Sequence, residues 1–520
     1  MGRSGCDHVV RAAACALLLA AAPAAAETVL NVGAFGADAN KLDPFLSGGG
    51  QDRALFGYVL NGVTRFPPGS MDPARIELDL AERYEASEDG RVWTFTLRDG
   101  VAFHHGYGTL SAADIVYSLN RVRDPKTSGF AQSFAAIETV EAVDPRTVRI
   151  TLERNVPTLL GMLADPSGGL IVSAKASAAL GEDVKARLVG TGPFAFESYT
   201  PKQQSTLVAH GAYFRGKPQI DKIVYRYIPS DNARELAFAA GEIDLFYGRR
   251  EQDWVDRMRR QHGAAIKIDV FAPSQSRIIH LNMAKPPLDD LRVRQAIAHA
   301  IDRSEFQALV GPDITVPLES PVPSGFLGQT TDVPRYPFDQ ARARALLAEA
   351  GRPNGVTLPV LTSQIASLRV PFELVMEQLR RVGITLATDF VDHAAWHQRI
   401  RRDESAVVIY GAAPFPIADA FLTPFFHGRT IVGTPTAETN FSHCAVADAE
   451  IDAARSEVDP ARRDALWAEA QRRIMAEVCA VPIFELMQVW ARRATLDYGY
   501  ELTGTLNLGP PITETTRLVR

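Results

Sequence analysis

Hydrophobic positions in the second half of the chain recur at helical spacing. Within residues 291–301 they stand at offsets 0, 3, 4, 7 and 8, at Val293, Ala296, Ile297, Ala300 and Ile301. This spacing places them on one side of a helix, which Asp289 or Asp290 would cap. Comparable helices are predicted at residues 339–350, 370–381 and 462–478. Short apolar runs predict strands at residues 357–361, 384–390 and 406–410. The alternation of helices and strands predicts an α/β fold.

The first half of the chain carries hairpin patterns instead. Within residues 84–103, apolar and polar residues alternate after an Asp89-Gly90 turn, which is typical of a half-buried strand. A second hairpin is predicted over residues 139–152. Between the two hairpins, Ser111 is expected to cap a helix. A short strand at residues 29–32 comes before all of these elements.

Residues 188–247 bring several turn and cap signals together. A Gly-Thr-Gly-Pro turn and two strands lead to an Arg-Gly-Lys-Pro turn. Another strand and a helix follow, and Ser230, Asp231 and Asn232 are candidate caps of that helix. We expect that helix to end before Gly241. Its buried face is predicted at Leu236, Ala237 and Ala240. Residues 211–218 match a phosphate-binding P-loop except at Pro218, which has no hydroxyl for a metal ion and would break the required helix. The segment is therefore interpreted as scaffold.

The N-terminus has the pattern of a secretory signal peptide. Arg3 and Arg11 give a basic start, and the apolar run at residues 12–22 is too short to span a bilayer as a helix. An A-x-A pattern ends at Ala26, so we expect cleavage before Glu27 and export of the remaining chain. No other apolar run reaches about 18 residues, the length of a membrane-spanning helix.

Composition narrows the classes of function. At 520 residues, 46% hydrophobic and 22% charged, the chain is long enough for two or more folded units. Its net charge of −6 gives no basis for a nucleic-acid partner, which would require a basic surface. Cys444 and Cys479 are the only cysteines after residue 26. In an exported protein they either form a disulfide or remain two unpaired thiols, with Cys479 packed at the end of its helix.

Motifs of catalysis and metal binding are weak or missing. No G-x-S-x-G nucleophile elbow occurs after residue 26, which argues against a secreted hydrolase. His393 and His397 stand four residues apart, a spacing that suits a metal ion, but their motif lacks the glutamate of a zinc protease. A metal or nickel-chelate carrier that uses His393, His397 or His280 stays open as an alternative. We expect neither an enzyme nor a bound cofactor.

An ordered set of motifs covers nearly the whole chain after residue 26. Residues 93–103 read WTFTLRDGVAF, residues 190–196 read GTGPFAF, and residues 281–303 read LNMAKPPLDDLRVRQAIAHAIDR. Residues 111–124 read SAADIVYSLNRVRD, and residues 341–351 read ARARALLAEAG. In their order along the chain, these motifs resemble those of the family 5 extracellular solute-binding proteins, the peptide and nickel receptors of ABC importers.

This resemblance implies a two-lobed α/β fold of the periplasmic-binding-protein-like type, class II. The first lobe would comprise residues 27–276 and 488–520, with an extra subdomain near residues 63–188. The second lobe would comprise residues 277–487. Such receptors close on their solute like a hinged clamp.

The resemblance also implies a hinge and a partner. Crossover strands at residues 277–282 and near residues 487–490 would form the hinge between the lobes. The protein would work in the periplasm as a monomer. It would deliver a peptide or peptide-like solute, captured between the lobes, to the membrane subunits of an ABC permease.

Ligand contacts are implied around the loops that face the space between the lobes. Open α/β sheets place ligands where buried strands end. The implied contacts are Phe35, Asn282, Trp396, Tyr410 and Phe415. Alternatives remain open for several of them. The rings of Phe35, Trp396 and Tyr410 would otherwise belong to the core, and Asn282 would otherwise satisfy only backbone groups.

Two further residues bear on the type of solute. Arg369 falls where dipeptide-binding relatives place an arginine that pairs with a ligand carboxylate; the alternative is a solvated arginine at a helix end. The aspartate that holds the ligand's amino group in those relatives aligns with Ala413 or Pro414, and the next acid is Asp419. Unless Asp419 bends inward, a buried ammonium would have no charge partner. A blocked peptide, a sugar derivative, an opine or another amide-rich solute is therefore favoured over an ordinary peptide.

Overall fold

The computed structural model describes residues 27–39, 41–46, 49–181, 188–412 and 415–519. The predicted signal peptide, residues 1–26, lies outside the described residues. Within the described part of the chain, no helix is long and apolar enough to cross a membrane.

A sheet of nine strands runs through the middle of the molecule. Its order is β10-β11-β12-β1-β13-β19-β14-β18, and β15 also pairs with β19. Strand β1 is parallel to β12 and β13, whereas β14 is antiparallel to β18 and β19. The strands are β1 Val29–Ala34, β10 Phe194–Thr200, β11 Gln204–Ala209, β12 Lys222–Tyr227, β13 Leu245–Tyr247, β14 Ile266–Leu281, β15 Thr315–Pro317, β18 Val407–Tyr410 and β19 Ala480–Arg493.

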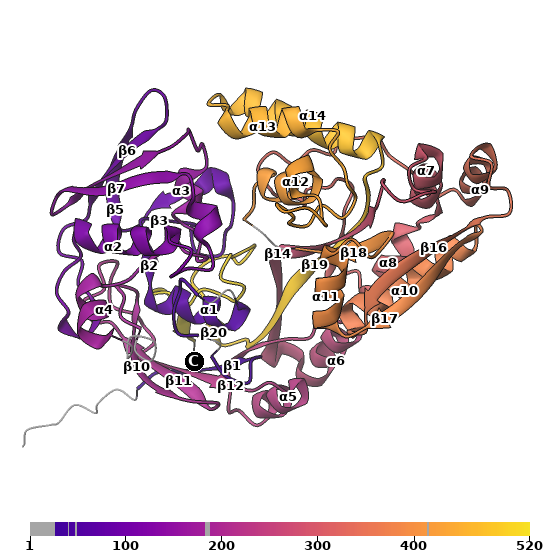
Figure 1. Cartoon of the computed structure of the whole chain (residues 1–520). Helices are drawn as coiled ribbons and strands as arrows, with labels where there is room; N and C mark the ends of the chain where they lie inside the picture. The colour runs from indigo at the N-terminus through magenta and orange to yellow at the C-terminus, as the bar shows by residue number, and fades with distance from the viewer. Residues whose placement is uncertain (1–26, 40, 47–48, 182–187, 413–414, 520) are drawn as a thin grey trace, which may run out of the picture.

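The two longest strands, β14 and β19, join two bodies that lie side by side (Figure 1). We call the elements before β14, together with the chain after β19, the first lobe. The elements between β14 and β19 form the second lobe. The ladder between these strands shifts register between Phe271 and Gln275. The two crossover segments predicted from the sequence fall in or beside these strands; the predicted lobe boundaries themselves remain predictions.

The first lobe carries a second sheet, of order β5-β6-β8-β7, on which helix α2 packs. Both predicted hairpins are confirmed, since β5 pairs with β6 and β7 with β8. Ser111 caps α2 and shares a capping box with Asp114. The elements are α1 Gly50–Val59, β2 Asn61–Gly62, β3 Thr64–Arg65, β4 Glu77–Leu78, β5 Ala81–Ala86, β6 Val92–Leu97, α2 Ala112–Arg123, β7 Ile137–Asp144, β8 Thr147–Leu152, α3 Leu159–Met162, β9 Leu170–Ile171, α4 Ala174–Leu180, α5 Asp231–Ala239, α6 Gln252–His262, β20 Leu496–Asp497 and β21 Arg517–Leu518.

The second lobe confirms the predicted alternation of helices and strands. Its parallel strands β16 and β17 pair directly, and α10 packs against both. Asp290 caps α7, and the predicted apolar face of that helix is buried. The elements are α7 Leu291–Ala300, α8 Arg303–Val310, α9 Gln340–Glu349, β16 Val356–Ser363, α10 Ala366–Arg380, β17 Ile384–Val391, α11 His393–Arg401, α12 Asp419–Phe426, α13 Asp448–Ser456 and α14 Pro460–Ala476.

The predicted buried face of helix α5 is wrong at Leu236 and Ala240, which are exposed, while Ala237 is half-buried against the core. Leu236 is 71% exposed, whereas Arg234 and Phe238 are buried. Arg234 belongs to the buried face because carbonyl oxygens surround its guanidinium group. Its Nε donates to the carbonyl of Tyr247 at 3.1 Å, and its Nη1 donates to the carbonyl of Ile228 at 2.6 Å. A count of apolar side chains misses an arginine whose polar atoms are satisfied in this way.

The Arg-Gly-Lys-Pro segment between β11 and β12 is a turn, as predicted. Gly216 has a φ of +115°, a backbone conformation that glycine adopts without strain. The neighbouring Arg215 reaches back into the first lobe and donates to Asp79 at 2.9 Å. Asp79 is 1% exposed and also accepts a hydrogen bond from Asn61 at 2.8 Å. The turn therefore anchors the first lobe through a buried ion pair and holds no phosphate-binding helix.

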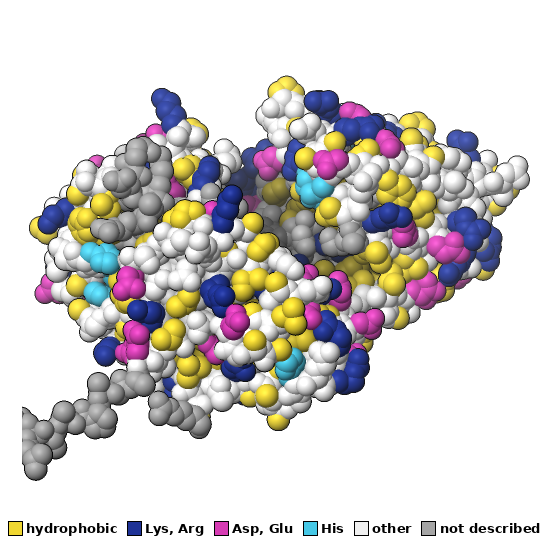
Figure 2. Space-filling view, turned by 90° about the horizontal axis from the view of Figure 1, so that it is seen from below, with side chains coloured by type: hydrophobic (Ala, Val, Ile, Leu, Met, Phe, Trp, Pro, Cys, Tyr) yellow, Lys and Arg dark blue, Asp and Glu magenta, His cyan; other side chains and the backbone are white. Residues whose placement is uncertain are grey.

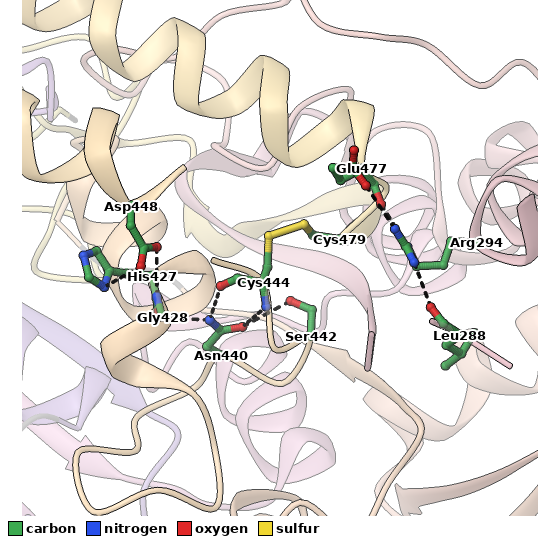
Figure 3. The surroundings of a disulfide bond; sticks show 10 residues. All are labelled: Leu288, Arg294, His427, Gly428, Asn440, Ser442, Cys444, Asp448, Glu477 and Cys479. Carbon is green, nitrogen blue, oxygen red and sulfur yellow. Dashed lines mark hydrogen bonds and ion pairs between the residues drawn. A yellow bond between two sulfur atoms is a disulfide. The ribbon is translucent and has the colours of Figure 1, made fainter. Parts of the chain in front are cut away.

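A disulfide joins Cys444 to Cys479, which decides between the two readings of these cysteines. The two Cα atoms are 5.8 Å apart, and both side chains are buried (Figure 3). The side chain of Asn440 holds the loop on one side of the bridge, donating to the carbonyl of Cys444 and accepting from its amide. On the other side, the carbonyl of Cys479 accepts from the amide of Leu281, the last residue of β14. The bridge thus fixes the loop before α13 beside the starting point of β19.

Candidate functional site

Two of the predicted ligand residues, Trp396 and Tyr410, stack on each other in the second lobe. Their ring centroids are 5.8 Å apart and the planes differ by 26°. Trp396 is 2% exposed and donates its indole N–H to the carbonyl of Leu361. Tyr410, at the end of β18, is half-buried and also contacts Phe441 at 5.1 Å. The tryptophan therefore supports the tyrosine from beneath, and the tyrosine is the member of the pair with solvent access.

The histidines of the metal hypothesis have other surroundings. The rings of His393 and His397 contact each other and the Trp396–Tyr410 stack. Burial, with repulsion from His393 and Arg401, lowers the pKa of His397 to about 4. His280 is buried beside the rings of Phe425 and Phe426, and this burial lowers its pKa to about 3. Across the described ranges, no group of three His, Cys, Asp or Glu side chains is arranged to hold a metal ion.

Phe415 reaches from the second lobe to the first. Its ring lies 5.9 Å from that of Phe66 and packs closely over Gly161, where a Cβ atom would come within 2.4 Å of the ring. The surface is hollowed between the two lobes (Figure 2). Beside Phe415 lies a cavity of about 320 Å³ that both lobes line. The position of this ring fits the predicted contact with a molecule held between the lobes.

Asp419 lines the same cavity from the first turn of α12. Its carboxylate accepts from the Thr423 hydroxyl at 2.6 Å and forms an ion pair with Arg455 at 3.5 Å. Arg154 of the first lobe also lines the cavity. Burial lowers the pKa of Arg154, and repulsion from Arg455 acts in the same direction. Asp419 is thus already engaged with a cation and a hydroxyl of its own lobe.

Phe35 follows β1 in the first lobe and is half-buried. Its ring lies 4.5 Å from that of Tyr247, the last residue of β13, at an angle of 42°. Tyr247 in turn meets the buried Trp490 edge-on at 5.8 Å. Tyr247 was not predicted as a site residue, because nothing in its local sequence separates it from a core tyrosine.

Asn282 and Arg369 stand apart from these aromatic groups and have partners in the second lobe. Asn282 is 1% exposed; its amide donates to Asp403 at 2.6 Å, and its oxygen accepts from the amide of Ala284. The side chain of Arg369 is 54% exposed and pairs with Glu373 at 2.7 Å on the surface of α10. Its guanidinium group also lies over Phe390. The ligand roles of both residues remain predictions.

Two arginines that were not predicted as site residues lie in or beside the long strands that join the lobes. Arg277 is on β14, and Arg250 follows β13 by a few residues. Both guanidinium groups donate to the same oxygen, Oε1 of Gln275, at 3.1 Å and 3.4 Å. No local pattern separates Arg277 from an ordinary polar residue of a strand, since Ser274, Gln275 and Ser276 come directly before it in β14.

A family model of bacterial extracellular solute-binding proteins, family 5, matches residues 75–432. Heme-binding protein A of Haemophilus influenzae is 28% identical to this chain. The match covers 82% of this chain and 81% of that protein. Di/tripeptide-binding protein 2 of Pseudomonas aeruginosa is also 28% identical, over 86% of this chain and 87% of its own length. The family match thus extends over most of the chain.

Among solved structures, MoaA of A. tumefaciens R10, in complex with mannopinic acid, is 45% identical to this chain. The match covers 95% of this chain and 100% of that one, with a TM-score of 0.81. This similarity confirms the predicted periplasmic-binding-protein-like α/β fold. The chain belongs to the bacterial extracellular solute-binding proteins, family 5, and has the features of an ABC-importer receptor.

Proposed function

We propose that this receptor captures an acidic, opine-type solute between its lobes. The observation that carries the proposal is the 45% identity to MoaA, which holds mannopinic acid, over 95% of the chain. The heme-binding and di/tripeptide-binding relatives share 28%. The higher identity to MoaA extends over 95% of this chain. The solute class of MoaA is therefore the one that we propose for this receptor.

The site supports the same choice. Apolar faces for a solute come from Tyr410 and Phe415 in the second lobe and from the Phe35–Tyr247 pair in the first. Around the end of β18, the chain reads Gly-Ala-Ala-Pro-Phe-Pro, without an acid to hold an ammonium group. Ala413 and Pro414, where relatives would place that acid, lie outside the described residues. Asp419 is already paired with Arg455, so an ordinary peptide amino terminus has no evident partner.

The remaining parts of the proposal follow the family. The chain is exported, loses residues 1–26 before Glu27 and works in the periplasm as a monomer. It binds its solute without chemical change and passes it to the membrane subunits of an ABC permease. Closure of the lobes removes water from the solute, which strengthens each polar contact.

Calorimetric titration of the purified protein tests the solute class. The panel comprises mannopinic acid, agropinic acid, di- and tripeptides, heme and Ni²⁺. We expect one of the two acids to bind most tightly. At about 100 times its dissociation constant it should raise the free energy of unfolding by about 2.7 kcal/mol. Small-angle scattering should show compaction with that acid alone. Tight binding of a peptide, heme or Ni²⁺, with neither acid bound, would contradict the proposal.

Replacing Phe415 by alanine is expected to weaken binding of the acid about tenfold. A buried aromatic contact of this kind contributes on the order of 1.4 kcal/mol, and Phe415 is the ring that contacts both lobes. The measurement is the dissociation constant by titration. Phe338→Ala is the matched control, because Phe338 is 43% exposed in the second lobe. An affinity equal to that of the control variant would remove Phe415 from the site.

A further inference from the structure

Arg277 is a buried cation without an acidic partner. It is 2% exposed. Its Nη1 donates to the carbonyl of Ser276 and its Nη2 to Gln275, both at 3.1 Å, while its buried Nε has no hydrogen-bond partner. No described acid forms an ion pair with it. Burial, together with repulsion from Arg250, lowers the pKa of Arg277 to about 9, so it stays charged near neutral pH.

The other buried arginines in the described part of the chain behave differently. Arg234, Arg294 and Arg463 are each at most 7% exposed. Each of them forms an ion pair, with Asp231, Glu477 and Asp464 respectively. This contrast matters because an unpaired buried charge costs several kcal/mol. Among the described arginines that are at most 7% exposed, Arg277 is therefore the one without an ion pair.

Arg250 adds a second positive charge at the same place. Its Nη1 shares Oε1 of Gln275 with Arg277, and its Nε donates to the carbonyl of Met487 at 2.7 Å. Its Nη2 donates to the carbonyl of Leu486. It too lacks an ion pair with any described acid, and burial lowers its pKa. Neutral backbone and amide oxygens hold both guanidinium groups in place, and the side chain of Tyr247 acts to raise the pKa of Arg250.

The arginine pair lies between the two aromatic parts of the candidate site. Arg250 comes three residues after Tyr247, whose ring contacts Phe35. On the other side, Arg277 lies against Gly411, the residue after Tyr410. A Cβ atom at position 411 would come within 2.7 Å of Nη1 of Arg277 and within 1.8 Å of the carbonyl oxygen of Ser276. Because residue 411 is a glycine, its backbone can approach the guanidinium group of Arg277 closely.

We propose that Arg250 and Arg277 form an anion subsite that binds a carboxylate of the solute when the lobes close. The inference rests on the proposed function, since an opine-type acid supplies that carboxylate. A guanidinium group presents planar, paired N–H donors that match the two carboxylate oxygens. A bound carboxylate would offset the repulsion between the two arginines and give the free Nε of Arg277 a partner. The charge would then favour acidic solutes over neutral ones.

Charge-removing variants test the subsite by titration with mannopinic acid at constant ionic strength. Arg277→Met is expected to raise the dissociation constant by about 30-fold or more, the usual effect of removing one partner of a desolvated charge pair. Arg277→Lys should retain part of the affinity, and Arg250→Met should also weaken binding. Arg380→Met is the control, since Arg380 is 69% exposed on the surface of α10. If Arg277→Met binds the acid as well as the control does, the subsite is wrong, while the solute class stands.

A second measurement does not depend on the solute. Without ligand, Arg277→Met should be at least as stable as the unchanged protein, because it removes an unpaired buried charge. Sulfate should raise the melting temperature of the unchanged protein more than that of Arg277→Met; the general stabilisation by sulfate acts on both. If neither opine acid binds but this difference is seen, the subsite stands and the solute class fails. A less stable variant that gains equally from sulfate would show a structural role for Arg277 and overturn the subsite.

Discussion

Replacing both Cys444 and Cys479 by alanine is expected to lower the free energy of unfolding by about 4 kcal/mol. The two cysteines are 35 residues apart, so their bond restricts a long loop of the unfolded chain. The loop contains α13 and α14, which pack against each other. Losing the bond therefore frees the segment that carries α13 and α14 in the unfolded chain.

Urea unfolding under non-reducing conditions measures this change. The oxidised protein and the double alanine variant are compared, each with and without dithiothreitol. The reductant should destabilise the unchanged protein by a similar amount and leave the variant unaffected. A loss below about 1 kcal/mol would mean that the bridge does not limit the unfolded chain as the loop-entropy argument requires.

Asp79→Ala is expected to cost about 3–5 kcal/mol of stability, because it leaves a partly buried cation without its partner. Asp79 accepts hydrogen bonds from Arg215 and Asn61, and the side chain of Arg215 is only 20% exposed. Removing the carboxylate leaves Arg215 with the carbonyl of Leu78 at 3.3 Å and Asn61 with the hydroxyl of Tyr213 at 3.5 Å, so the cation loses its only charged partner among the described residues. The loss should appear in the first lobe, since all of these residues belong to it.

Thermal unfolding followed by circular dichroism measures the effect. Glu82→Ala is the matched control, because Glu82 pairs with Arg146 at 3.0 Å on the surface and exposed pairs contribute about 0–1 kcal/mol. The double variant Asp79→Leu with Arg215→Met should recover much of the stability, as an apolar pair avoids the unpaired charge. If Asp79→Ala melts like the control, the buried pair is not the anchor of the turn.

Local sequence patterns predicted most elements of the fold, because their causes lie within a few residues. The first hairpin turns at Asp89-Gly90 and the second forms within residues 139–152, as predicted, and α9 lies within the predicted range 339–350. The exception is α5, whose buried face includes an arginine. The carbonyl of Tyr247 that satisfies Arg234 comes from β13, and helical periodicity carries no information about it.

The site was predicted less completely, because its contacts join distant segments. Trp396 and Tyr410 were each expected near the ligand, but their stacking depends on how α11 packs beside β18. Phe415 was expected from the end of a buried strand, which is a topological rule. Arg250 and Arg277 were not predicted, because their shared feature, that no described acid forms an ion pair with either of them, exists only after folding. The family resemblance predicted the architecture. The two arginines of the proposed anion subsite can be identified only from the packing of the folded chain.

Strand β19 follows the second lobe in the chain but pairs with β13 of the first lobe. The strand completes the first-lobe sheet by pairing with β13, as at Leu245 and Arg492, and Trp490 lies in the same core as β1. In chain order the helices of the second lobe come before β19, so an exported chain delivers this strand to the first lobe last. Until then the edge of β13 is bare, and contacts separated by more than two hundred residues form slowly. The first lobe comes first in the chain, but its sheet is complete only after β19 has followed. A chaperone therefore has the longest interval to act on the first lobe.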